Sequence, residues 1–285
     1  MVPPKGYRGM KHSIWLLVPV LGLLGAGPAS AEASLNLVSP GQIRFLTNPI
    51  YPPMEFVDPK TGALSGFDID LGKAIAAKMG LKDSWSQAAF AQLQSSLQTR
   101  RGDVILSGMS DNVKRRASMD FIDYITTGPI LFTLNSKAKA FKTPADFCGK
   151  KIAGSRSTSF SVDVPKWSTD NCVAKGRPAI TYEGTEDSNA ARLGMKQGRY
   201  DGVVQGIETI AYQMRIEPNT YIMVGDPLFK NDVFGIGVSK SNPQLRDALV
   251  KVLNDLVKSG DYGKLLAKWG LTKNAIPAIT VNSVK

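Results

Sequence analysis

Short β-type runs alternate with helical segments along the chain from residue 43 onward, and this alternation constrains the fold more than any other feature. In the segment 68–79, apolar side chains at Leu71, Ile75 and Met79 share one helical face, and Gly80 ends the pattern. Alternating strands and helices are typical of α/β proteins, whose helices cover largely parallel sheets. We therefore expect an α/β fold.

The expected strands are 43–47, 55–57, 63–64, 85–87, 104–107, 151–153, 179–182, 202–204, 221–224 and 233–238. The expected helices are 68–79, 90–99, 144–147, 159–167, 186–197, 207–215, a segment opened by Asn242 and Pro243, and 261–269. The β-rich runs near 130–134 and 231–238 are candidate crossovers between two lobes. Two lobes leave a cleft between them, where small ligands commonly bind.

The first 31 residues have the pattern of a cleavable export signal. A basic stretch precedes a mostly apolar run over 14–24, and the small-x-small pattern at 29–31 predicts cleavage before Glu32. The apolar run is too short and too interrupted for a stable membrane span, and no later segment is long or apolar enough. We expect an exported, periplasmic protein.

Cleavage also removes His12, the only histidine, and lowers the formal net charge by three, from +11 to +8. A mature chain without histidine lacks Ser-His-Asp and Cys-His mechanisms and His-ligated metal sites. It also lacks a Gly-rich phosphate loop of the usual spacing. Because its basic residues are scattered among acids, we expect no nucleic-acid partner. We expect neither a cofactor nor a metal.

Cys148 and Cys172 are the only cysteines, and both lie in the exported part. An isolated pair in an oxidising compartment usually forms a disulfide. Closing a loop of about 25 residues would stabilise the fold by roughly 3.5 kcal/mol in the chain-entropy model. The alternative is two separate buried thiols. A catalytic thiol is disfavoured, because no histidine remains to activate it.

The stretch 107–116 has the chemistry of a carboxylate site. Three small residues let a backbone approach a ligand closely: Ser107, Gly108 and Ser110. Asp111 or Asn112 can cap a short helix whose free N–H groups attract an anion. Arg115 adds a planar charged fork suited to two carboxylate oxygens. The alternative is that 114–116 is a solvated basic run.

The chain from about Gln42 to Asn282 resembles the extracellular solute-binding proteins of family 3, which deliver polar amino acids to ABC importers. The motifs that carry the resemblance are Gly66-Phe-Asp-Ile-Asp-Leu71, Gly108-Met-Ser110 with Arg115, Asp146-Phe-Cys-Gly-Lys-Lys151, Gly198-Arg-Tyr-Asp201 and Lys268-Trp-Gly-Leu271. The resemblance implies a two-lobed periplasmic-binding-protein fold of type II, with two mixed sheets flanked by helices and a two-strand hinge. It places lobe 1 at 42–131 and 236–285, lobe 2 at 135–230, and the hinge strands at 130–135 and 229–237.

The resemblance also implies roles for individual residues. Arg115 should hold the ligand carboxylate, helped by Ser110 and Thr158. Ser107 and Gly108 are expected on the same wall, and Ser157 is expected among the ligand-binding residues. Tyr51 and Phe67 match positions that pack on the ligand side chain, although ordinary core or rim packing is the alternative for both.

Departures from the family pattern bear on the ligand. Gly206 stands where the family commonly has an aspartate for the ligand ammonium group, so either Glu208 or Gln205 substitutes or the ligand is no ordinary α-amino acid. Asn48 replaces a commonly acidic position, which disfavours cationic ligands. Arg156 adds a second positive group to the cleft or is a surface arginine. These differences favour a neutral or acidic ligand.

The leading function is therefore a monomeric binding protein that delivers a small carboxylate-bearing solute to the membrane permease of an ABC importer. One alternative is an enzyme resembling exported cyclohexadienyl or arogenate dehydratases on the same fold, with Glu208 as general acid. Another is a periplasmic helper that binds no ligand, whose cleft is filled by its own side chains.

Overall fold

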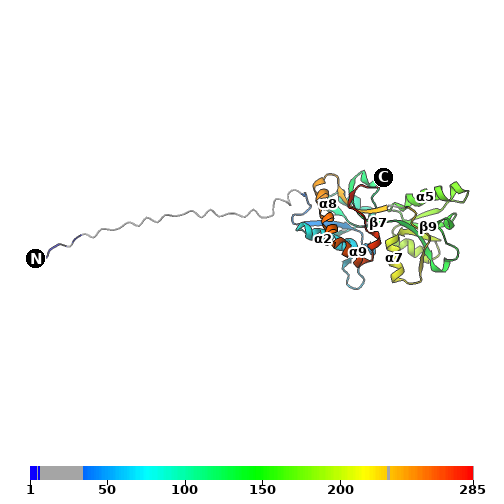
Figure 1. Ribbon diagram of the computed structural model, residues 1–285, viewed down its shortest axis with the longest axis horizontal. Coiled ribbons are helices and arrows are strands. Elements are labelled where there is room, and N and C mark those ends of the chain that lie inside the picture. The colour runs from blue at the N-terminus through cyan, green and yellow to red at the C-terminus, as the bar shows by residue number, and fades with distance from the viewer. Residues whose placement is uncertain (5, 7–34, 230–231, 285) are drawn as a thin grey trace.

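The computed structural model describes residues 1–4, 6, 35–229 and 232–284. Residues 35–229 and 232–284 form two α/β lobes, which lie at the left and the right of the folded part in Figure 1. The expected export signal and its cleavage site fall almost entirely outside the described residues, so they remain a prediction. Within the described ranges, no helix combines the length and the apolar character that a bilayer span requires.

Lobe 1 is built on a six-stranded mixed sheet with the strand order β14-β7-β13-β6-β1-β5. Its strands are β1 (Gln42–Thr47), β5 (Lys82–Gln87), β6 (Val104–Ile105), β7 (Met119–Thr127), β13 (Asp232–Ser239) and β14 (Thr280–Val281). β1 pairs in parallel with β5 and β6, whereas β13 pairs antiparallel with β6 and β7. A separate antiparallel sheet contains β2 (Ile50–Tyr51), β3 (Glu55–Val57) and β4 (Leu64–Ser65).

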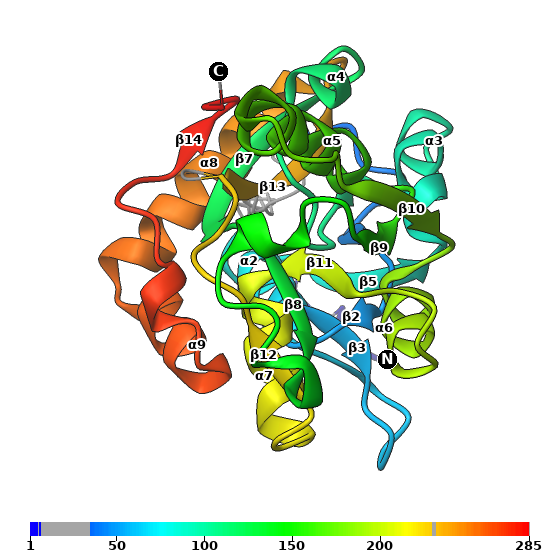
Figure 2. The ribbon, with the colours of Figure 1, turned by 90° about the vertical axis from the view of Figure 1, so that its right-hand side faces the viewer.

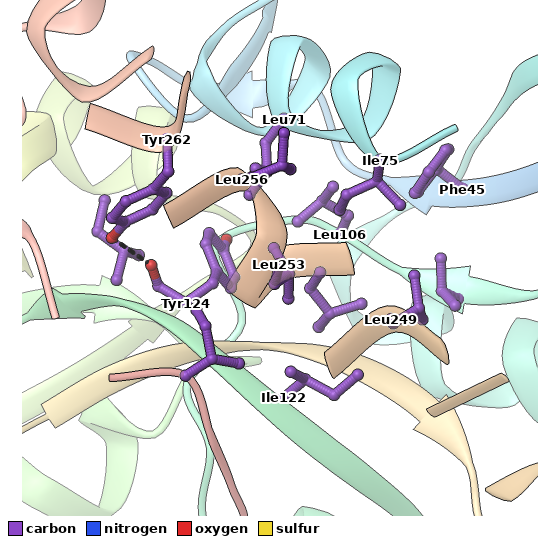
Figure 3. Close-up of a cluster of buried hydrophobic side chains, with 14 of the residues drawn as sticks. Phe45, Leu71, Ile75, Leu106, Ile122, Tyr124, Leu249, Leu253, Leu256 and Tyr262 are labelled. Atoms are coloured by element: carbon purple, nitrogen blue, oxygen red, sulfur yellow. Dashed lines mark hydrogen bonds between the residues drawn. The ribbon is translucent and has the colours of Figure 1, made fainter. Parts of the chain in front are cut away.

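Three helices enclose the core of lobe 1 together with the large sheet: α2 (Phe67–Met79), α8 (Pro243–Lys258) and α9 (Asp261–Trp269). The fully buried side chains of Leu249, Leu253 and Leu256 on α8 pack against residues of α2 and β7 (Figure 3). The hydroxyl group of Tyr262 donates to the carbonyl oxygen of Tyr124 at 2.7 Å, which ties α9 to β7. The apolar residues that recur along these helices therefore lie on the face that packs against the sheet.

Lobe 2 has a five-stranded sheet with the order β10-β9-β11-β8-β12. Its strands are β8 (Pro129–Leu134), β9 (Lys151–Ser155), β10 (Thr181–Thr185), β11 (Gly202–Gly206) and β12 (Tyr221–Met223). One face packs on α5 (Phe160–Asn171), and the other on α6 (Ser188–Lys196) and α7 (Ile207–Ile216), as Figure 2 shows. Neighbouring residues of β11 point to opposite faces: Val203 packs with α6 and α7, and Val204 with α5.

The expected disulfide is present in lobe 2, where Cys148 and Cys172 are joined with 5.6 Å between their Cα atoms. It connects the end of the turn Pro144–Phe147 to the end of α5. The remaining helices are short: η1 (Phe90–Gln92), α3 (Leu93–Gln98), α4 (Val113–Arg116), η2 (Asn135–Lys137), η3 (Pro144–Phe147), η4 (Val173–Lys175) and η5 (Thr272–Asn274).

The chain crosses between the lobes twice, and the first crossing precedes the expected hinge strand. The first crossing lies between Thr127 and Pro129, because β7 belongs to the sheet of lobe 1 and β8 to that of lobe 2. The second lies between Leu228, which bonds to Pro129, and Asp232, which pairs with Thr127. The expected hinge strand 130–135 therefore lies mostly within β8 of lobe 2, just after the first crossing. The expected hinge strand 229–237 begins at the second crossing and continues into β13 of lobe 1.

The two-lobed α/β fold is confirmed, with differences in detail. The expected helix 90–99 is a 3₁₀ turn followed by α3, and the expected strand 179–182 begins at Thr181. Strands β2 and β14 were not expected. Each has two residues and exists because a neighbouring strand offers hydrogen-bond partners, which a local pattern does not reveal.

Candidate functional site

A cavity of about 490 Å³ lies between the lobes. Lobe 1 lines it with residues around Tyr51, Phe90 and Arg115 and with the turn after β6. Lobe 2 contributes 155–160, the loop that leads into α5, and 186–188, the loop that leads into α6. Both lobe-2 segments follow the carboxyl ends of parallel strands, where ligands of open α/β sheets commonly bind.

Arg115 lies on the cavity wall and projects from the four-residue helix α4. Asn112 caps this helix by accepting a hydrogen bond from the Arg115 N–H at 2.9 Å, which confirms one of the two expected caps. The guanidinium group donates to two backbone carbonyl oxygens, that of Ser110 at 2.9 Å and that of Ser157 in lobe 2 at 3.3 Å. It also lies over the ring of Phe90, 5.4 Å from the centroid.

No carboxylate oxygen of the described residues lies within 4.0 Å of the Arg115 guanidinium. Burial lowers the pKa of Arg115 to about 10, and the more distant carboxylates of Asp232 and Asp163 oppose that shift. The group therefore stays positively charged near neutral pH. A half-buried cation with only carbonyl partners can accept a carboxylate from a ligand.

The turn after β6 forms the lobe-1 wall at Ser107, Gly108 and Ser110, as expected. The Ser107 hydroxyl accepts a hydrogen bond from the Asn48 N–H at 2.9 Å and donates to Glu55 Oε1 at 2.9 Å. The Gly108 N–H donates to a buried carboxylate of α2, and the positive φ of 45° at this residue favours glycine. These internal bonds leave the wall rigid rather than free to turn toward a ligand.

Asn48 also lines the cavity, and its Nδ2 donates to the carbonyl oxygen of Ala88 at 2.9 Å. The neutral amide of Asn48, which stands where the family commonly has an acid, therefore lies beside the cavity. Its effect on ligand charge remains a prediction.

The loop after β9 forms the opposite wall at Arg156, Ser157 and Thr158. The Thr158 hydroxyl donates to the carbonyl oxygen of Ser155 at 2.8 Å, which leaves its oxygen free to accept. Arg156 is exposed and still borders the cavity, and its Nε donates to the carbonyl oxygen of Thr185 at 3.2 Å. Arg156 is thus a rim residue that brings a second positive charge to the cavity mouth.

The expectation that Phe67 packs on the ligand is wrong. Its side chain is fully buried in the core of lobe 1, between the rings of Tyr124 and Tyr262 at centroid distances of 6.2 and 6.4 Å. Phe90 is the aromatic residue that lines the cavity beside Arg115. The sequence held one signal for Phe90, which begins a helix directly after the parallel strand β5. The sheet edge where β5 ends faces the cleft.

Gly206, Glu208 and Gln205 are not on the cavity wall. Glu208 is buried behind Tyr51, whose hydroxyl donates to Glu208 Oε1 at 3.3 Å and accepts a hydrogen bond from the Gly206 N–H at 3.1 Å. Gln205 is fully buried and accepts a hydrogen bond from Arg192. We expected Glu208 or Gln205 to replace the missing aspartate, but neither residue contacts the cavity directly.

A side chain on residue 206 would overlap the Glu208 carboxyl group and would approach the Tyr51 hydroxyl to 2.6 Å. The Glu208 carboxyl therefore occupies the space that the family's aspartate would fill. Burial raises the pKa of Glu208 to about 7, against the opposing hydrogen bonds from Thr127 and Tyr51. Tyr51 itself lines the cavity as expected.

Glu55 is a cavity residue that the sequence did not reveal. It is 1% exposed, and its Oε2 has no hydrogen-bond donor among the described residues. Burial, together with the nearby Asp68 carboxylate, raises the pKa of Glu55 well above its ordinary value. Asp68 accepts hydrogen bonds from the Tyr124 hydroxyl and the Gly108 N–H, and burial raises its pKa to about 6. Burial therefore disfavours the ionised form of both carboxyl groups.

Among the described residues, no group of three or more His, Cys, Asp or Glu side chains has the arrangement of a metal site. The cavity offers one guanidinium on its wall, a second at its rim, hydroxyl groups, several aromatic rings and three carboxyl groups. This set suits a small molecule with a carboxylate group.

Comparisons with known proteins agree with this geometry. The family model described as bacterial extracellular solute-binding proteins, family 3, matches residues 43–272. The arginine-binding protein ArgT of Corynebacterium glutamicum is 28% identical over 235 residues, which cover 82% of this chain and 76% of that protein. The histidine-binding periplasmic protein of Salmonella typhimurium is 25% identical, with coverage of 85% and 92%.

Solved structures extend the likeness. An ancestral arginine-binding protein bound to glutamine has a TM-score of 0.72 and 30% identity, covering 82% of this chain and 99% of that one. An ancestral amino acid-binding protein described as a precursor of cyclohexadienyl dehydratase has a TM-score of 0.69 and 26% identity, with coverage of 80% and 95%.

Proposed function

The chain belongs to the bacterial extracellular solute-binding proteins of family 3, and we propose that it captures a small carboxylate-bearing solute between its lobes for an ABC importer. The observation that carries this proposal is the Arg115 guanidinium, which faces the cavity between the lobes without a carboxylate partner among the described residues. An acid group of the ligand would supply that partner. The lobes would then close around the solute, because both walls contact it.

We further propose that the solute is a neutral or acidic amino acid, or a derivative of one. The two guanidinium groups at the cavity, those of Arg115 and Arg156, favour negative charge. Of the acids on the wall, Glu55 has its pKa raised by burial, which disfavours its ionised form, and Asp187 is engaged as the cap of α6. Glu186 is exposed at the rim. The curated relatives are named for basic amino acids: one for arginine, one for histidine, and one for lysine, arginine and ornithine. An ancestral arginine-binding protein, however, is bound to glutamine in its solved structure.

The two other functions receive less support. The relatives are substrate-binding transport proteins and not enzymes. Glu208, the expected general acid of a dehydratase, lies behind Tyr51 rather than on the cavity wall. A cavity of about 490 Å³ also weighs against a helper whose cleft is filled by its own side chains.

A ligand screen tests the proposal. The chain beginning at Glu32 would be purified and its melting temperature measured with amino acids, dicarboxylates and modified amino acids. A ligand that binds only the native state raises the melting temperature by mass action. We expect the largest shifts with neutral or acidic compounds, followed by calorimetric titration of the best one. Arginine or lysine binding more tightly than these would overturn the proposed ligand class, and no shift with any compound would overturn solute capture.

A further inference from the structure

Four groups form a polar bridge between the lobes, at the end of the cleft nearest the crossing strands. Tyr51 of lobe 1 contacts the Gly206 N–H and the Glu208 carboxyl of lobe 2, at 3.1 and 3.3 Å. Thr127, the last residue of β7, donates its hydroxyl to Glu208 Oε2 at 2.8 Å. We call this set, Tyr51, Thr127, Gly206 and Glu208, the interlobe bridge. Its Tyr51 contacts join the two lobes across the cleft.

The bridge depends on a carboxyl group that water hardly reaches. Glu208 is 4% exposed and lies in the first turn of α7. It fits there because Gly206 has no side chain, since a Cβ atom at that position would overlap it. Both Glu208 oxygens contact hydroxyl groups, so the carboxyl is satisfied by neutral partners rather than by a cation.

The charges around Glu208 are mostly acidic. Tyr51 and Glu55 face it from the β2–β3 hairpin, and Asp232 faces it from β13. Two cations, Arg215 and Lys273, line a second cavity with Glu208. Neither cation lies within 4.0 Å of the Glu208 carboxyl group. The same holds for every other basic side chain among the described residues. The surroundings therefore disfavour the ionised form.

Building on the function proposed above, we propose that closure of the cleft takes up one proton at Glu208, so that the protein binds its solute more tightly in acidic than in alkaline medium. Opening separates Tyr51 from Glu208 and lets water reach the carboxyl. In the closed form burial raises its pKa to about 7, whereas a hydrated carboxyl has the ordinary value of 4.5. Closure is thus linked to protonation, because the two forms differ in proton affinity.

The sign of the effect follows from the raised pKa in the closed form. The contribution of Glu208 to closure is fully present below the open-form value of 4.5 and is lost as the pH rises through about 7. Solute affinity should therefore fall over this range, by roughly tenfold or more between pH 5 and pH 8. Proton uptake on binding should be largest between the two pKa values.

Calorimetric titration with the best amino acid from the screen measures this uptake. At pH 6, the binding enthalpy would be measured in buffers of different ionisation enthalpy, whose slope gives the protons taken up per solute. We expect a value approaching one for the native protein and near zero for Glu208→Gln, which keeps the shape and cannot ionise. An equal value in the two proteins, or no uptake at all, would overturn the proposal.

Two matched variants separate Glu208 from other acids. Glu183→Gln changes an exposed glutamate of β10 outside both cavities and should keep the native uptake and pH profile. Asp232→Asn removes the other nearby carboxyl whose pKa burial raises to about 7. If uptake disappears in Asp232→Asn and persists in Glu208→Gln, the proton resides on Asp232 and the assignment is wrong.

Small-angle X-ray scattering of the unliganded protein keeps the inference testable apart from solute binding. We expect a smaller radius of gyration at pH 5 than at pH 8 for the native protein, and no such difference for Glu208→Gln. If no solute binds yet this contraction occurs, solute capture fails and the proton-linked closure stands. If a solute binds without proton uptake or contraction, solute capture stands and the proton-linked closure fails.

Discussion

The Arg115 guanidinium of lobe 1 donates a hydrogen bond to the carbonyl oxygen of Ser157 in lobe 2 at 3.3 Å. This contact spans the cleft beside the cavity, so one side chain both faces the cavity and touches the opposite lobe. A ligand carboxylate held by Arg115 would therefore lie directly against the loop that leads into α5.

Arg115→Ala should weaken solute binding by about 100-fold or more, because the ligand carboxylate loses its charged partner. Arg115→Lys should recover only part of the loss, since an ammonium group cannot form two parallel hydrogen bonds. Lys114→Ala removes an exposed cation from the same short helix and should bind as the native protein does. Calorimetric titration of the three variants measures these differences, and native affinity in Arg115→Ala would remove Arg115 from the site.

Phe90 and Phe67 should separate binding from stability. Phe90→Ala should lower solute affinity, because Phe90 lines the cavity and supports the Arg115 guanidinium, with little change in unfolding. Phe67→Ala should lower the free energy of unfolding by about 3–5 kcal/mol, because it empties a fully buried site. Urea unfolding and calorimetry on both variants test the contrast. Loss of affinity in a folded Phe67→Ala without loss in Phe90→Ala would reverse the assignment.

Glu55 should make stability depend on pH. Burial raises its pKa well above the ordinary value and raises that of Asp68 to about 6, so their stabilising contribution is fully present at low pH and is lost as the pH rises through the folded-state values. The free energy of unfolding should therefore fall between pH 5 and pH 8, and Glu55→Gln should reduce that fall. Urea unfolding at pH 5 and pH 8 measures the fall in the native protein and in Glu55→Gln, with Glu183→Gln as the control. An unchanged pH dependence in Glu55→Gln would show that Glu55 does not contribute to it.

Gly206→Ala should weaken solute binding by disturbing the interlobe bridge, because its Cβ atom would overlap the Glu208 carboxyl and crowd the Tyr51 hydroxyl. The matched control is Gly263→Ala in α9, where an added Cβ meets no atom within 4 Å. We expect lower affinity and a smaller pH dependence in the first variant and native behaviour in the second. Native affinity and pH profile in Gly206→Ala would show that the bridge can rearrange without cost.

The sequence predicted the α/β alternation, the caps at Asn112 and Asn242 and the disulfide, because these depend on short-range patterns or on an isolated pair of cysteines. It also predicted that Arg115, Tyr51 and the turn after β6 would share one cavity. The prediction for Phe67 failed because a motif match does not say which face of a helix meets the core.

The positions of Glu55 and Glu208 could not be predicted for a different reason. Each carboxyl is placed by contacts between residues far apart in the chain, such as Ser107 with Glu55 and Tyr51 with Glu208. The first hinge strand was placed within β8 because a β-rich run has the same local pattern in either lobe. Burial and charge at such positions arise only once the two lobes are assembled.

The two crossings also impose an order on the assembly of the molecule. Lobe 2 is one uninterrupted length of chain inserted into lobe 1, whose central strand β13 and edge strand β14 come after it in the sequence. During synthesis from the N-terminus, lobe 2 therefore has all its strands at a point when lobe 1 still lacks β13 and β14. The host sheet can therefore be completed only after lobe 2 has been synthesised, when β13 is available to pair with β6 and β7.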